Sequence, residues 1–231
     1  MNTLASLINP IANAFNSGGF WMWAILLAQI VSISIIIERF ISLYVLRKPR
    51  QRQIAIKIED EIKRSSMDRV LSKLKATGKT NPVSVVAMAG IQAAVNYGGK
   101  EEIQSRMDEV IMQENSRLNS RTGFLAMLAN VGTLLGLLGT IVGLINAFGS
   151  VANVNPIEKA ALLSQGISMA MNTTAYGLIM AIPALVMFSV LSSRANALEE
   201  DLDQGALKVF NSLSFTLDRI GKSQSSNKAI K

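Results

Sequence analysis

The sequence predicts an all-α membrane protein, with three transmembrane helices that extend into long cytoplasmic helical segments. Two observations support this class. Only 17% of the 231 residues are charged, whereas soluble domains carry about 25% charged residues. Three stretches, residues 1–37, 122–157 and 160–193, contain no charged side chain. A helix needs about 20 apolar residues to span a bilayer, so each stretch is long enough to do so.

The composition also excludes several kinds of chemistry. The chain has no cysteine and no histidine, which removes disulfides, thiolate nucleophiles, most zinc sites and histidine-based acid–base catalysis. We therefore expect no enzymatic activity, no metal and no cofactor. The net charge of +7 is typical of the cytoplasmic side of a membrane protein, so we expect contact with membrane lipids and none with nucleic acid.

The first span is expected at residues 20–46, after a periplasmic segment at residues 1–19. Trp21 and Trp23 lie at its outer end, and a basic cluster at residues 47–52 follows its inner end. Positive charges stay inside, which places the N-terminus in the periplasm. Because no positive residues precede the apolar run, we interpret it as an anchor and not as a cleaved leader. Glu38 and Arg39 are expected to reach water as an interfacial charged pair.

Residues 47–122 are predicted to form a cytoplasmic helical region. Ile54, Ile58 and Ile62 recur at helical spacing. Residues 83–95 are apolar but too short to span, so we expect a buried helix there. From Lys100 a further helix is expected to continue without interruption into the membrane.

The second and third spans are predicted at residues 123–149 and 161–193, joined by a periplasmic loop at residues 150–160. Asn155 and Pro156 are typical of a helix start. The short loop makes the two spans an antiparallel hairpin. Pro183 is expected to kink the third span. Residues 194–231 should form a cytoplasmic C-terminal helix, with a disordered tail over the last ten residues.

Four glycines in the second span fall on one helical stripe. Their spacings of four, three and four residues favour close packing of helix backbones in lipid. The stripe consists of Gly132, Gly136, Gly139 and Gly143.

Polar residues in the same two spans predict an ion-passing lining, because polar groups inside a membrane tend to mark pathways. The alternative is that each hydroxyl bonds back to a carbonyl of its own helix. Neither span contains a carboxylate, so the chain supplies no titratable group at mid-membrane. The candidate pathway residues are Thr133, Thr140, Asn172, Thr173 and Thr174.

Three motifs resemble the MotA/TolQ/ExbB proton-channel family, and in particular its TolQ and ExbB branch. They are the stretch Leu134–Phe148 (LLGLLGTIVGLINAF), the stretch Gly166–Ala184 (GISMAMNTTAYGLIMAIPA) and Glu38-Arg39-Phe40. The resemblance in topology covers nearly the whole chain.

The resemblance implies a homopentamer around a dimer of a single-span TolR/ExbD-like protein in the central pore, with a TonB/TolA-like third component as a further candidate partner. An aspartate of the single-span partner would take up the ion, and the threonines facing it correspond to Thr140 and Thr174. The implied function is a subunit of an inner-membrane motor that couples ion flow, with H+ expected and Na+ as the alternative, to mechanical work on the envelope. A non-conducting scaffold is the alternative function.

The chain departs from the family at one position. TolQ and ExbB proteins carry a glutamate early in the third span, in a Gly-Ile-x-Glu-Ala pattern, and this chain has Met169 there. The departure suggests that the ion or its route differs. We hypothesise that Asn172, with Ser168 one turn away, replaces part of the missing polarity.

Overall fold

The computed structural model describes residues 19–46, 51–64, 67–77, 81–96, 98–151 and 154–228, and its regular elements there are all helices. The chain forms two compact units. The first, which we call the spanning unit, combines the described residues up to Phe40 with residues 121–191. The second, the charged unit, combines residues 41–120 with those from 192 onward. Two predicted features lie outside the described ranges. They are residues 1–18 of the N-terminal segment and residues 47–50 of the basic cluster.

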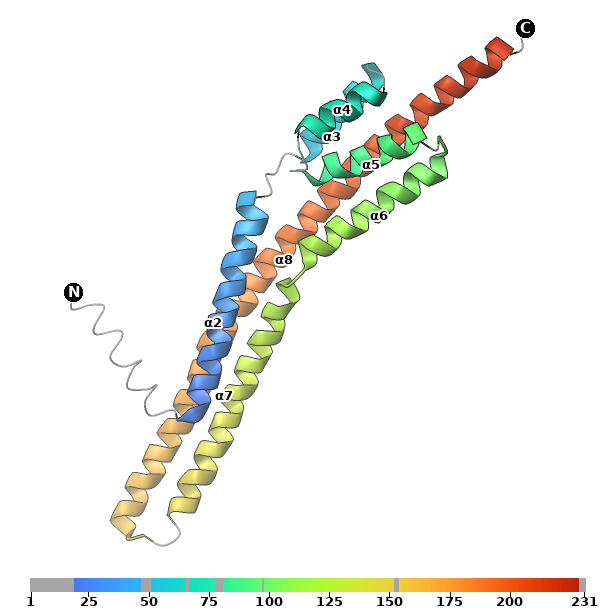
Figure 1. The fold of residues 1–231 in the computed structure, drawn as a ribbon. Helices are drawn as coiled ribbons and strands as arrows, with labels where there is room; N and C mark the ends of the chain where they lie inside the picture. The colour runs from blue at the N-terminus through green and yellow to red at the C-terminus, as the bar shows by residue number, and fades with distance from the viewer. Residues whose placement is uncertain are drawn as a thin grey trace, which may run out of the picture. The chain divides into compact units, whose positions relative to one another are not determined.

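The spanning unit contains three helices. They are α2 (Phe20–Phe40), α7 (Thr122–Ser150) and the first part of α8 (Pro156–Lys228), and α2 packs along α7 (Figure 1). All three are long and apolar enough to cross a membrane, so the predicted helical fold with three apolar helices is confirmed. In the most apolar 18-residue stretch of this first span, only 17% is buried within the chain. Most of the surface of α2 is therefore left for lipid or other chains.

The start of α8 follows from its local sequence. The helix begins at Pro156, whose fixed φ suits the first helical position. The N–H of Lys159 donates to the carbonyl of Asn155 at 2.9 Å, which closes the first turn. The connection between α7 and α8 is therefore residues 151–155, shorter than the loop predicted at residues 150–160.

The predicted uninterrupted helix from Lys100 into the membrane is wrong. Helix α6 (Lys100–Asn119) ends before α7 begins, and Arg121 between them has a φ of 63°. An L-residue rarely adopts this left-handed conformation. The Arg121 guanidinium donates to the Glu38 carboxylate at 2.7 Å, a contact between residues 83 positions apart that the local pattern does not reveal.

This ion pair also changes the interpretation of the C-terminal end of α2. Glu38 was expected to act beside Arg39, but its carboxylate forms an ion pair with Arg121 across the helix pair. Both side chains of the pair are about half exposed, and exposed ion pairs contribute about 0–1 kcal/mol. Arg39 is 5% exposed, so it is buried against the unit and does not extend into water.

The glycine stripe of α7 faces α8, as its spacing predicts. A β-carbon added at Gly136 would lie 3.3 Å from the Cα of Thr174, and one added at Gly143 would lie 3.1 Å from the Cβ of Ala170. Added β-carbons at Gly132 and Gly139 would overlap the side chains of Met180 and Thr173. All four glycines are buried. The helices run antiparallel along this stripe, which we call the glycine seam.

Helix α8 contributes its own glycine to the seam. A β-carbon added at Gly177 would lie 2.7 Å from the carbonyl oxygen of Gly132 and 3.1 Å from the Cα of Gly136. The obstacle is backbone and not a flexible side chain, so the helices would have to move apart. The two backbones therefore approach most closely where both helices lack a β-carbon.

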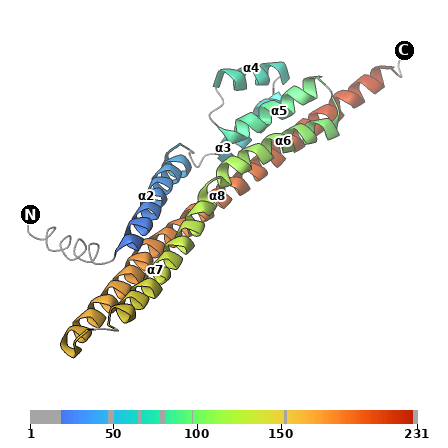
Figure 2. The same ribbon diagram turned by 60° about the horizontal axis from the view of Figure 1, so that its bottom comes forward.

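The charged unit is built from shorter helices. These are the π-helical segment Ile41–Leu46, α3 (Gln51–Arg64), α4 (Met67–Thr77), α5 (Pro82–Asn96), α6 and the later part of α8. Helix α5 packs against α3, α4 and α6 (Figure 2). It is apolar on most sides, as expected of a helix surrounded by others. The predicted buried helix at residues 83–95 is confirmed, with Asn81 capping it by accepting from the N–H of Val83 at 3.0 Å.

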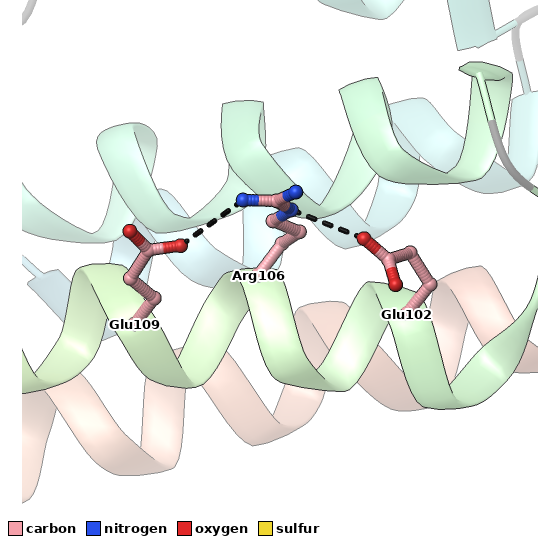
Figure 3. Close-up of polar contacts among 3 residues, drawn as sticks. All are labelled: Glu102, Arg106 and Glu109. Carbon is pink, nitrogen blue, oxygen red and sulfur yellow. Dashed lines mark hydrogen bonds and ion pairs between the residues drawn. The ribbon is translucent and has the colours of Figure 1, made fainter.

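One core joins the helices of the charged unit. Its buried members include the predicted isoleucines Ile58 and Ile62 of α3, together with side chains of α6 and α8. Except for Glu114, which is 6% exposed, the carboxylates of α6 lie on its outer face. There Arg106 donates to Glu102 at 3.1 Å and to Glu109 at 3.3 Å (Figure 3). The hydrogen bond and charge of Glu102, followed by those of Glu109, raise the pKa of Arg106.

Two further predictions concern α8, namely the disordered tail and the kink at Pro183. The helix is continuous through Pro183 and reaches Lys228, so the disordered tail predicted for the last ten residues is wrong as far as Lys228. No proline follows Pro183, and helix propagation gains one hydrogen bond per residue. The kink expected at Pro183 stays a prediction.

The glycine seam predicts a contrast between two alanine substitutions. Gly177→Ala should destabilise the spanning unit by about 1–3 kcal/mol, because its methyl group meets backbone atoms. Gly123→Ala, in the first turn of α7, meets nothing within 4 Å, and it should be neutral or stabilise by up to about 1 kcal/mol. Thermal unfolding of the purified chain in detergent, followed by circular dichroism, measures both. Equal Tm values for the two variants would contradict the close approach.

Candidate functional site

The glycine seam brings two of the predicted pathway residues together. The hydroxyl oxygens of Thr140 on α7 and Thr174 on α8 are in direct hydrogen-bond contact. Thr140 also lies 3.2 Å from the carbonyl of Ala170. The contact depends on Gly136, because any side chain there would push against the backbone of Thr174. We call the two threonines the hydroxyl pair.

The hydroxyl pair has more acceptors than protons. The carbonyl of Gly136 lies 3.1 Å from both hydroxyl oxygens, and the carbonyl of Ala170 offers Thr140 a second acceptor. Each threonine has one proton and two lone pairs. The two protons can therefore be arranged in several ways while the side chains stay in place. A group entering the seam could receive a hydrogen bond from the pair or donate one to it.

The other candidate residues are placed differently. Thr173 is fully buried, its hydroxyl donates to the Met169 carbonyl at 2.8 Å, and its methyl group fills the space beside Gly139. Thr133 is exposed and donates to the Ala129 carbonyl at 3.1 Å. Both hydroxyls bond back to their own helix, which matches the alternative weighed from the sequence. Asn172 is half-buried one residue before Thr173.

Met169 points toward the start of α2. A β-carbon added at Gly19 would overlap the terminal methyl group of Met169, so the side chain covers the N-terminal end of α2. It lies five residues before Thr174 on α8, and its terminal methyl group lies against Gly19. The position that differs from the TolQ and ExbB pattern is thus a helix-packing position in this chain.

A polar contact between α2 and α8 was missed from the sequence. The hydroxyl of Tyr176 donates to the side-chain oxygen of Gln29 at 2.5 Å. The signal was available, because Gln29 is the only amide in the uncharged run of α2 and polar groups within spans mark functional contacts. The carbonyl of Ala170 was also missed, since a sequence does not show which backbone groups face a neighbouring helix.

The geometry can be compared with known proteins. The sequence profile described as the MotA/TolQ/ExbB proton channel family matches residues 78–204. The chain is 28% identical to the biopolymer transport protein ExbB of Pseudomonas putida over 134 residues, which cover 58% of this chain and 40% of that protein. It is 32% identical to the Tol-Pal system protein TolQ of Haemophilus influenzae over 130 residues, which cover 56% of this chain and 50% of that protein. The chain thus spans about half the length of these relatives.

A solved structure supports the fold. The structure of C. jejuni MotAB matches with a TM-score of 0.59 and 16% identity, covering 94% of this chain and 86% of that one. At this identity the likeness concerns the fold alone. The profile covers more than half of the chain and includes the glycine seam and the hydroxyl pair. The chain therefore belongs to the MotA/TolQ/ExbB proton channel family, in its TolQ and ExbB branch, and is a multi-pass membrane protein.

Proposed function

We propose that the chain is a stator subunit of an ion-driven motor in the bacterial inner membrane. Five copies would surround a dimer of a single-span TolR/ExbD-like partner, and ion flow between the two would perform mechanical work on the cell envelope. The observation that carries this proposal is the hydroxyl pair, Thr140 and Thr174, held at a seam that contains no carboxylate. Its hydroxyl groups would interact with the partner's carboxyl group, which would carry the ion.

The chemistry of the pair suits this role. A carboxylate needs hydrogen-bond donors, whereas a protonated carboxyl group also needs an acceptor. The pair can supply either, because Gly136 and Ala170 offer its protons alternative acceptors. The threonines would thus solvate both states of a partner's carboxyl group inside the membrane, where water is scarce. The chain itself would take part without a cofactor, with H+ as the expected ion and Na+ as the alternative.

The charge distribution supports an orientation. The basic residues at 47–52 adjoin the end of the first span, and residues 1–37 carry no charge. We infer that the N-terminus lies in the periplasm and that the charged unit lies in the cytoplasm. A non-conducting scaffold is the competing function, and the back-bonded hydroxyls of Thr133 and Thr173 are compatible with it.

Removing either hydroxyl of the pair tests conduction. Thr140→Val and Thr174→Val keep the side-chain shape, so each should lower ion flux at least tenfold while assembly persists, because the partner's carboxyl group would lose one of its two hydroxyl contacts. Thr140→Ser keeps the hydroxyl and should retain flux. Proton uptake into liposomes that contain the chain and its single-span partner, reported by a pH-sensitive dye, is the measurement.

The matched control for this experiment is Ser150→Ala. Ser150 is exposed at the end of α7 and donates only to the carbonyl of Asn146, at 2.7 Å. Its flux should equal that of the unmodified chain. Unchanged flux in both valine variants would refute conduction at the hydroxyl pair and favour the scaffold.

The position of Met169 gives a second prediction. Because its side chain packs against Gly19 at the start of α2, Met169→Glu should leave the choice between H+ and Na+ unchanged. Met169→Gln is the uncharged control of equal shape. The measurement is flux at varied pH with and without sodium. A change of ion in the glutamate variant alone would show that this position takes part in ion selection.

A further inference from the structure

The amide of Gln29 is only partly satisfied within the chain. Its oxygen accepts from Tyr176 at 2.5 Å. Its NH2 group carries two further donors, and the described residues supply neither with an acceptor. Gln29 is half-buried, so the NH2 group is open at the surface of the spanning unit.

The location of Gln29 makes an unpaired NH2 group energetically unfavourable. Gln29 lies nine residues after Phe20, which is about 14 Å along α2. Its partner Tyr176 adjoins Gly177, which packs on Gly132 and Gly136 in the seam. The amide is therefore well inside the span, where water is scarce. Polar groups left without a partner there are strongly unfavourable, so an acceptor from outside the chain is expected.

The chain itself exposes an acceptor at the same depth. Thr133 follows Gly132, whose carbonyl lies against Gly177. The Thr133 side chain is exposed, and its proton is used in the bond to the Ala129 carbonyl at 3.1 Å. The lone pairs of its oxygen remain available. At the same depth of the spanning unit, α2 thus carries a free donor, the NH2 group of Gln29, and α7 carries a free acceptor, the hydroxyl oxygen of Thr133.

We propose that the NH2 group of Gln29 in one copy donates a hydrogen bond to the hydroxyl oxygen of Thr133 in the neighbouring copy. The donor lies on α2 and the acceptor on α7, so two different surfaces of the chain meet in a head-to-tail contact. Repetition of such a contact forms a closed ring when the rotation between neighbouring copies closes. The inference rests on the proposed assembly of several copies and is independent of ion conduction.

The first test is a double-mutant cycle on assembly. Gln29→Leu and Thr133→Val each remove one side of the bond, and Ser34→Ala is the control, since Ser34 is an exposed polar residue of the same helix. Hydrogen bonds between membrane helices are worth about 0.6 kcal/mol, or roughly a threefold change in affinity. Each single variant should weaken assembly in detergent about threefold, measured by sedimentation, and the double variant should be no weaker than either. Ser34→Ala should assemble normally.

Other outcomes of the cycle overturn the proposal. Normal assembly of Gln29→Leu would show that the amide contacts lipid or water. Additive losses in the double variant would show that the two residues act separately. Weak assembly of Gln29→Leu beside normal assembly of Thr133→Val would assign the amide to another acceptor. Flux measurements play no part here, so failure of this inference is distinguishable from failure of the proposed function.

A second test leaves Gln29 intact, in case its variant fails to fold. The chain has no cysteine, so single spin labels can be placed at Ile33→Cys and Val31→Cys without other changes. Both positions are about half exposed, and they lie about 40° and 160° from Gln29 around the helix. In liposomes that contain this chain alone, the label at position 33 should be immobilised and shielded from oxygen. Equal oxygen access at both positions, or shielding that requires the single-span partner, would refute contact between copies.

Discussion

The close approach of two helix backbones, made possible where α7 and α8 both lack side chains, is the constraint on which the spanning unit depends. Gly136 and Gly177 meet almost backbone to backbone. Within a bilayer the surrounding lipid is as apolar as leucine, so helices gain little from burying large side chains and associate through close contact instead. The seam thereby determines the register of α7 against α8. The same register brings Thr140 and Thr174 into contact.

The register also explains why neighbouring threonines differ. Thr173 and Thr174 are adjacent in sequence, yet a rotation of about 100° per residue directs them differently around α8. Thr173 fills the space that Gly139 leaves, whereas Thr174 reaches the carbonyl of Gly136 across the seam. Both side chains therefore contact α7, the first by packing and the second by a hydrogen bond. A sequence that lists both as polar residues at one depth does not separate these roles.

Much of the fold could be predicted because its signals are local. The uncharged runs identify the apolar helices, and the spacing of Gly132, Gly136, Gly139 and Gly143 identifies the face that meets α8. The interruption at Arg121 could not be predicted, since it accompanies an ion pair with Glu38 that joins distant parts of the chain. The contact between Gln29 and Tyr176 depends on how α2 rotates against α8, which no local pattern determines. Local signals thus located the helices, while contacts between helices decided what individual side chains do.

The chemical nature of the hydroxyl pair has a consequence for how such a protein responds to acidity. Threonine hydroxyls neither gain nor lose protons over the range of pH in which cells live, so the seam has the same charge in acid and in alkali. One arrangement of the two hydroxyl groups can therefore serve at every physiological pH, because the pair has only one ionisation state. Any acid sensitivity of the protein must then originate outside the seam, for example in carboxylates such as Glu38 and Glu158 near the ends of the helices, while the seam itself keeps the same chemistry at every pH.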